Sequence, residues 1–434
     1  MRINKTYSLI IILVCLSLSA RAETSYVDLE AYKGKIYSAP PTDEITHLLN
    51  KGWGSFMSSV KESVFLDNIS SDQFWNTLRS SLAEGTFYNR LANFQTSDNL
   101  TGADIVFKTI YSSVNQVPVQ YKSILPNGDS IPLSGKIFLP KNKQAKHIIV
   151  ASHYTICADK EAPSNAYSIE GIYAIKDYIV LMPDYIGYGI TDSLTHPYLH
   201  LQTSVSSAVD LLNAAIPYLN ANQYTYYKSI ILIGYSQGAA VTLALQKTLE
   251  EQYAGVYPIN KVFAGAGPYD LGATFDFYAQ QSTTDLPCTL PMLILGLNYG
   301  ENLGLQREDF FRPFLMEQCP RLIESKSFTI NEVNVALGKE ISKLLKPVIY
   351  DKDQYPTSIL YNAIQKNSIL HWTPQSDLFL FHSTTDNMVP YINSEHIKQE
   401  FDTQQLENIE YDFAPYGNHM EAAITFFEKV YRSL

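Results

Sequence analysis

The feature that most restricts the fold of this chain is a series of short, almost continuously apolar segments. They are HIIVAS (147–152), YIVLMPDY (178–185), SIILIGYS (229–236), KVFAGAG (261–267), LFLFHS (378–383) and IEYDFAP (409–415). Strands that are buried on both faces belong to parallel sheets covered by helices. Helical patterns lie between several of the segments, at 204–219, 239–253 and 420–434. The alternation predicts an α/β fold with a mostly parallel central sheet flanked by helices.

The segments before this series predict a different arrangement. Residues 105–114, 118–126 and 131–140 are rich in β-branched and aromatic residues, and Asn127-Gly128 is a strong hairpin turn. We expect antiparallel strands at one sheet edge. The α/β domain then spans 103–434, and residues 23–102 form an N-terminal helical extension that carries no recognisable chemical motif.

The alternation of strand and helix patterns stops between Leu271 and Leu378. The sequence there has several helical stretches, scattered prolines and no convincing long strand. We therefore expect residues 272–370 to form a helical cap, inserted before the seventh core strand.

The N-terminus has the pattern of a secretory signal. Arg2 and Lys5 precede an apolar run at 8–18, and Ala20-Arg21-Ala22 provides small residues at a cleavage site. The run is too short to span a bilayer. We expect residues 1–22 to be a signal peptide cleaved after Ala22, which makes the protein secreted or periplasmic, with no stable membrane insertion.

Charge and cysteine content exclude several classes of protein. The formal net charge is −11 and there is no run of Lys or Arg, so a nucleic-acid partner is not expected. The cysteines beyond the signal pattern are three, Cys157, Cys288 and Cys319, and no two of them have the C-x-x-C spacing. This argues against a zinc site and against a disulfide framework. We expect one disulfide bridge and one free thiol. Cys288 and Cys319, which both lie beside a proline, are the expected pair.

The segment Gly234-Tyr235-Ser236-Gln237-Gly238 joins an apolar strand to a helical pattern. Glycines on both sides of Ser236 permit a sharp turn, because neither has a Cβ that would collide with nearby backbone. Ser236 would then project above the sheet, beside the N–H of Gln237 at the start of the helix, where an oxyanion can be stabilised. This pattern predicts a nucleophilic serine.

A nucleophilic serine requires a base and an orienting acid. Asp386 follows the strand at 378–383, and His419 lies in a Gly-containing loop between the last strand and the last helix. Both would reach the carboxyl ends of parallel strands, where the sites of open α/β sheets lie. Asp270, just past the preceding strand, is the alternative acid.

Three motifs, GYSQG, TTDNMVP and GNH, resemble those of the α/β-hydrolase superfamily, and MPDYIGYG with HPYLH resembles the secreted lipases and esterases similar to Candida lipase A. The resemblance covers about 105–434. It implies Ser236 as nucleophile, His419 as general base and acid, and Asp386 as the acid that fixes the imidazole tautomer.

The resemblance also implies a second oxyanion donor after the third strand, where the family commonly has His-Gly. This chain has His153-Tyr154-Thr155 instead. By position the N–H of Thr155 is preferred, with Tyr154 as the alternative, and His153 is expected to anchor the loop.

These observations lead us to expect a serine carboxylic-ester hydrolase with an acyl-enzyme mechanism, acting on small or polymer-attached esters of short to medium acyl chains. No metal or organic cofactor is implied. Three alternatives stay open: a lipase for long-chain glycerides, a serine peptidase of the prolyl-oligopeptidase type, and a hydrolase-fold protein that only binds a ligand.

Overall fold

A computed structural model describes residues 24–35, 71–83 and 114–434. The expected signal peptide at 1–22 lies outside the described residues. The described chain forms one nine-stranded sheet with the order β1-β2-β3-β5-β4-β6-β7-β8-β9. Its strands are β1 (Val27–Asp28), β2 (Asn115–Ile124), β3 (Ser130–Leu139), β4 (Ile148–Ser152), β5 (Ile179–Pro183), β6 (Ile230–Tyr235), β7 (Ile259–Gly265), β8 (Leu378–Ser383) and β9 (Ile409–Ala414).

The six apolar segments of the sequence form the strands β4 to β9, and neighbours among these strands pair in parallel. β2 and β3 form the expected antiparallel hairpin, and β3 also pairs antiparallel with β5. Every residue of β4, β5, β6 and β8 is buried. The mostly parallel sheet predicted from the sequence is therefore confirmed, and the continuous apolarity has its cause in burial of both faces.

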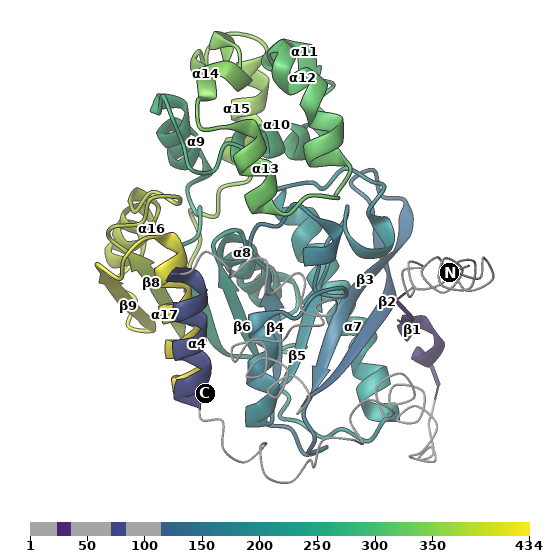
Figure 1. Cartoon of the computed structure of the whole chain (residues 1–434). Coiled ribbons are helices and arrows are strands. Elements are labelled where there is room, and N and C mark those ends of the chain that lie inside the picture. The colour runs from purple at the N-terminus through teal and green to yellow at the C-terminus, as the bar shows by residue number, and fades with distance from the viewer. Residues whose placement is uncertain (1–23, 36–70, 84–113) are drawn as a thin grey trace, which may run out of the picture.

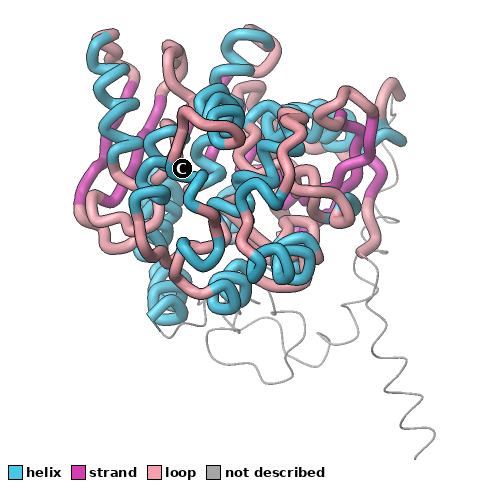
Figure 2. The backbone as a smooth tube through the Cα atoms, turned by 90° about the horizontal axis from the view of Figure 1, so that it is seen from above, coloured by secondary structure: helices cyan, strands magenta, loops and turns pink. Residues whose placement is uncertain are grey.

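Two apolar cores cover the two faces of this sheet. Alternate residues of one strand belong to opposite cores: Ile148 and Val150 of β4 contact one, and Ile149 and Ala151 contact the other. The first core includes the helices α7 (Leu201–Ala221), α8 (Gln237–Gln252) and α16 (Ile392–Thr403). The second includes α4 (Ser71–Ala83), η3 (Ile169–Lys176) and α17 (His419–Ser433). From above, strands of the sheet lie at opposite sides of the molecule, with helices between and over them (Figure 2).

A group of helices lies between β7 and β8 in the sequence. We call α9 to α15 the inserted helices, and they stand together at the top of Figure 1. Their bounds are α9 (Leu271–Gln280), α10 (Thr289–Gly300), α11 (Arg307–Phe310), α12 (Pro313–Cys319), α13 (Ile330–Leu337), α14 (Ile341–Leu344) and α15 (Thr357–Lys366). They share an apolar core of their own. Short helical turns complete the described chain: η1 (Leu29–Tyr32), η2 (Asp159–Glu161), η4 (Gly189–Thr191), η5 (Pro320–Glu324) and η6 (Pro347–Tyr350).

The segment 23–102 contributes more than the helices expected of it. Val27 and Asp28 pair in parallel with Val119 and Gln120, so β1 adds a strand to the sheet. The unpaired backbone groups of a sheet edge favour such an addition, which a helical pattern does not reveal. The helix α4 packs beside α17 (Figure 1), where Arg79 pairs with Glu428. Within the described ranges, no helix has the length and apolarity needed to cross a membrane.

The expected bridge between Cys288 and Cys319 is wrong, because Cys157, Cys288 and Cys319 are all free and buried. Cys288 instead faces Cys157, whose Sγ also lies 3.6 Å from Sδ of Met292. The hydrogen bond with Cys288, together with burial, raises the pKa of the Cys157 thiol well above its ordinary value. Tertiary packing thus brings the start of α10 to the loop after β4, and proximity to proline carried no information on pairing.

The carboxyl group of Glu170, on η3, is fully enclosed in the protein. Among the described residues, neither of its side-chain oxygens has a hydrogen-bond partner. Burial raises the pKa of Glu170 from 4.5 to about 7, because a low-dielectric surrounding disfavours the charged form.

We expect this buried acid to make stability depend on pH. The folded state keeps a proton that the unfolded chain releases. The stabilising contribution of protonated Glu170 to the free energy of unfolding is therefore fully present below about pH 4.5 and is lost as the pH rises through about 7. When the pH is raised from about 4 to about 8.5, the unfolding free energy of wild type should therefore fall by up to about 3 kcal/mol more than that of Glu170→Gln. Urea unfolding at both pH values measures this. The exposed Glu251→Gln is the control, and equal pH dependence in all three proteins would contradict the expectation.

Candidate active site

Ser236 occupies a sharp turn between β6 and α8. Its φ is +57°, a conformation that non-glycine residues rarely adopt. A Cβ on Gly234 would collide with the carbonyl oxygen of Gly238, and a Cβ on Gly238 would collide with that of Ser152. The two glycines thus allow β6, α8 and the end of β4 to approach closely enough to hold Ser236 in its strained conformation.

His419 and Asp386 lie beside this serine. Nε2 of His419 is 2.9 Å from Oγ of Ser236, and Nδ1 of His419 is 2.6 Å from Oδ2 of Asp386. His419 is the first residue of α17, which Asn418 caps by accepting hydrogen bonds from the N–H groups of Met420 and Glu421. The structure therefore brings together three residues that the sequence spreads over the turn after β6, the loop after β8 and the start of the last helix.

The environment of Asp386 keeps its carboxyl group ionised. Its side chain is fully buried, and burial alone would raise its pKa, but the charges and hydrogen bonds of His419 and His382 outweigh burial and hold the pKa well below its ordinary range. Oδ1 also accepts hydrogen bonds from the N–H groups of Met388 and Val389, at 2.8 and 2.9 Å. An ionised carboxylate at Nδ1 keeps the proton on that nitrogen, so Nε2 is free to accept the proton of Ser236.

The two residues expected to supply oxyanion donors are both close to Ser236. Gln237 follows it as the first residue of α8, where backbone N–H groups have no acceptor within the helix. Thr155 lines the same small pocket as Ser236 and His419, together with Tyr154. Oγ1 of Thr155 lies 3.0 Å from the hydroxyl of Tyr198, a contact that ties this loop to the chain before α7.

The competing candidates have other partners. Oδ2 of Asp270 lies 2.7 Å from Nδ1 of His396, and its Oδ1 caps α9 through the N–H of Ala273. The ring nitrogens of His153 lie 2.6 and 3.3 Å from the backbone carbonyls of Tyr154 and Asp184. Burial lowers the pKa of His153 to about 4, so its ring is neutral and hydrogen-bonded to the loop that it was expected to anchor.

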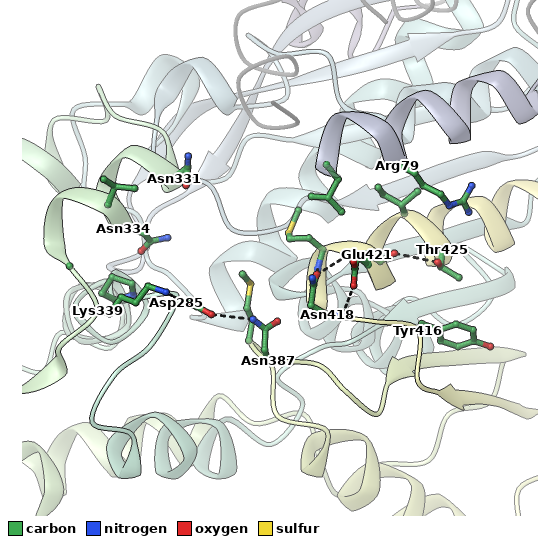
Figure 3. A pocket seen from close by; sticks show the side chains of 17 residues that line it. Arg79, Asp285, Asn331, Asn334, Lys339, Asn387, Tyr416, Asn418, Glu421 and Thr425 are labelled. Carbon is green, nitrogen blue, oxygen red and sulfur yellow. Dashed lines mark hydrogen bonds and ion pairs between the residues drawn. The ribbon is translucent and has the colours of Figure 1, made fainter. Parts of the chain in front are cut away.

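Two adjacent spaces lie at this site. The inner pocket beside Ser236 has a volume of about 40 Å³, and its apolar lining includes Ile169, Leu286, Ile330 and Phe427. A groove of about 900 Å³ shares Met388, Met420 and Ile424 with that pocket. Side chains of α4, α13 and α17 line the groove (Figure 3).

The groove also contains a polar link from the inserted helices to His419. Lys339 pairs with Asp285 at 2.6 Å, and the Nδ2 of Asn387 donates to Oδ2 of Asp285 at 3.3 Å. Asn387 in turn accepts the backbone N–H of His419, at 3.2 Å. Figure 3 shows Asn387 between Asp285 and the start of α17. Sequence analysis missed Asn387, since its position after Asp386 gives no indication of either contact.

Part of the chain matches a known family. Residues 195–270 match the family described as Phospholipase/Carboxylesterase. The matched residues include α7, β6, α8 and β7, and thus the turn that holds Ser236. Among curated proteins, none matches this chain.

Solved structures resemble most of the chain. The rice cell wall degrading esterase LipA from Xanthomonas oryzae is 19% identical, with a TM-score of 0.65 over 76% of this chain and 92% of LipA. An inferred hydrolase of Legionella pneumophila is 21% identical, with a TM-score of 0.68 over 84% and 94%. Candida antarctica lipase A is 16% identical, with a TM-score of 0.55 over 70% and 73%.

The sheet order, the strained serine turn and these similarities define one class of protein. The chain has the α/β-hydrolase fold and resembles the esterase and lipase group of that superfamily, as the sequence motifs predicted.

The contacts of the two candidate acids predict different effects on Ser236. Asp386→Asn should slow the reaction of Ser236 with a fluorophosphonate by about 10³- to 10⁴-fold, because an amide oxygen no longer favours the required imidazole tautomer. Asp270→Asn keeps a good helix cap and should slow the reaction less than about tenfold. Labelling rates measured by intact-protein mass spectrometry compare them. The opposite ranking would assign the acid to the end of β7.

Proposed function

We propose that the protein is a secreted or periplasmic serine carboxylic-ester hydrolase. The observation that carries the proposal is the continuous hydrogen-bond chain from Oγ of Ser236 through both ring nitrogens of His419 to Asp386. The match to a phospholipase and carboxylesterase family and the similarity to an esterase and a lipase support the same reaction class. The signal pattern at 1–22, outside the described residues, supports export.

The proposed reaction passes through an acyl-enzyme. Oγ of Ser236 attacks the ester carbonyl carbon while Nε2 of His419 takes the hydroxyl proton. The N–H groups of Gln237 and Thr155 stabilise the oxyanion. As the tetrahedral intermediate collapses, the C–O bond to the alcohol breaks and His419 returns the proton to the leaving oxygen. Water then attacks the acyl-enzyme by the same route, which releases the acid and restores Ser236.

The inner pocket and the adjacent groove suggest where the acyl and alcohol parts of the ester bind. The inner pocket is apolar and small, which favours a short to medium acyl chain. Leu286 and Ile330, from the segment 272–370, line this pocket, so we propose that the segment acts as a cap over the acyl group. The much wider groove then receives the alcohol part, from a small molecule or an ester attached to a polymer.

A first test removes the nucleophile. Ser236→Ala should lower the hydrolysis of p-nitrophenyl butyrate by about four to six orders of magnitude, as loss of a triad member does. Ser282→Ala removes an exposed serine between α9 and α10 and serves as the matched control. A Ser236→Ala enzyme within about tenfold of wild type would show that the serine is not the nucleophile, and wild-type cleavage of dipeptidyl anilides in place of esters would favour the peptidase.

A second test measures the acyl chain. Each methylene that the inner pocket buries contributes about 0.8 kcal/mol, as long as space remains. kcat/KM for p-nitrophenyl esters should therefore rise from acetate to butyrate or hexanoate and fall beyond about ten carbons. Leu286→Ala widens the pocket and should move the maximum to longer chains. A steady rise to palmitate with activation at an oil–water interface would instead identify a lipase.

A further inference from the structure

His382 is a second histidine in contact with Asp386. It lies on β8, four residues before Asp386, and its side chain is fully buried. Nε2 of His382 is 3.4 Å from Oδ2 of Asp386 and 3.1 Å from the carbonyl oxygen of Val389. Nδ1 of His382 is 2.6 Å from Oγ of Ser394. Beyond its part in lowering the pKa of Asp386, this ring has no role in the proposed reaction.

The contacts determine which nitrogen of His382 carries the hydrogen. The carbonyl oxygen of Val389 can only accept a hydrogen bond, so Nε2 of His382 must donate. In the neutral ring, Nδ1 is then an acceptor, and the Ser394 hydroxyl donates to it. Ser394, from α16, is itself fully buried, so water does not compete for this contact. Ser394 therefore favours the tautomer whose Nε2–H points toward both Val389 and Asp386.

This N–H is shared between the carbonyl oxygen of Val389, at 3.1 Å, and the carboxylate of Asp386, at 3.4 Å. Oδ1 accepts from two backbone N–H groups. Oδ2 lies between two imidazoles, with Nδ1 of His419 on one side and Nε2 of His382 on the other. Carboxylate oxygens have lone pairs for all these contacts, and each further donor reduces the freedom of the group to rotate.

Besides His419, two tyrosines among the described residues lie near His382 and Asp386. The ring of Tyr391 packs edge-on against the ring of His382, with centroids 5.6 Å apart. The hydroxyl of Tyr278, from the inserted helices, donates to the carbonyl oxygen of Met388, at 2.8 Å. Both contacts involve atoms other than Oδ2 of Asp386, which His382 faces at 3.4 Å.

We propose that His382, held in one tautomer by Ser394, is a positioning residue that keeps Oδ2 of Asp386 directed at His419. The chain of polar contacts thus extends from Ser236 through His419, Asp386 and His382 to Ser394. The effect on ester turnover rests on the proposed function, whereas the effect on the bond between His419 and Asp386 does not. If His382 only fills the core, the state of that bond is independent of it.

The kinetic test compares variants that keep or remove the donor. His382→Leu should lower kcat for p-nitrophenyl butyrate by about 10- to 100-fold, as loss of a donor to a charged group does, with KM within about twofold. His382→Gln keeps an N–H near the position of Nε2 and should recover most of kcat, and Ser394→Ala should lower kcat about three- to tenfold. His396→Gln disrupts a second His–Asp pair, away from Ser236, and should leave kcat unchanged.

The second readout is the far-downfield proton resonance of Nδ1–H of His419, which needs no substrate. Relative to wild type, it should shift or disappear in His382→Leu and Ser394→Ala, and it should stay in place in His396→Gln. Ser394→Ala removes only one oxygen atom, so it still tests the positioning role of His382 if His382→Leu does not fold. An unchanged resonance in the folded variants would overturn the positioning role, whatever happens to kcat.

The two proposals can fail separately. If wild type hydrolyses esters but neither readout responds to His382→Leu and Ser394→Ala, the positioning role is wrong and the proposed function stands. If the resonance responds as expected while wild type hydrolyses no ester and its Ser236 is not labelled by a fluorophosphonate, the positioning role stands and the proposed function is wrong.

Discussion

The organisation of this protein depends on a parallel sheet that is buried on both faces. Parallel strands place their carboxyl ends at one edge, so the loops that follow β6, β8 and β9 meet although the sequence separates them. Ser236 and His419 are 183 positions apart in the chain, yet their side chains are in hydrogen-bond contact. The helices of the two cores pack on the two faces of the sheet that carries these strand ends.

The loop after β8 is the point at which the separate parts of the molecule converge. Asp386 binds His419 at the start of α17, and its backbone neighbours satisfy its other oxygen. Asn387 joins His419 to Asp285 before α10, and the carbonyl of Met388 accepts from Tyr278 of α9. One short loop therefore contacts both the sheet domain and the segment that carries the inserted helices.

Local patterns predicted much of this arrangement. The segment 378–383 coincides with β8, and each of the other five apolar segments differs from its strand by at most two residues at either end. The Gly residues around Ser236 and the order of Ser236, Asp386 and His419 also led to residues that lie together. The same patterns missed β1 and suggested a Cys288–Cys319 bridge that the structure does not contain. Edge pairing and thiol proximity depend on segments distant in sequence, which no local periodicity records.

The sequence by itself determined the α/β class, the parallel core and the serine turn. Burial on two faces requires continuous apolar segments, and the close approach of the backbone around Ser236 requires glycine at Gly234 and Gly238, so both are visible in the residue types. Only the tertiary structure decided that Asp386 and not Asp270 faces His419, since Asp270 also follows a strand end but pairs with His396. It also decided that His382 contacts Asp386 and Ser394. That contact depends on how β8 packs against α16, and the choice of partner for a buried polar group is a property of the packed interior.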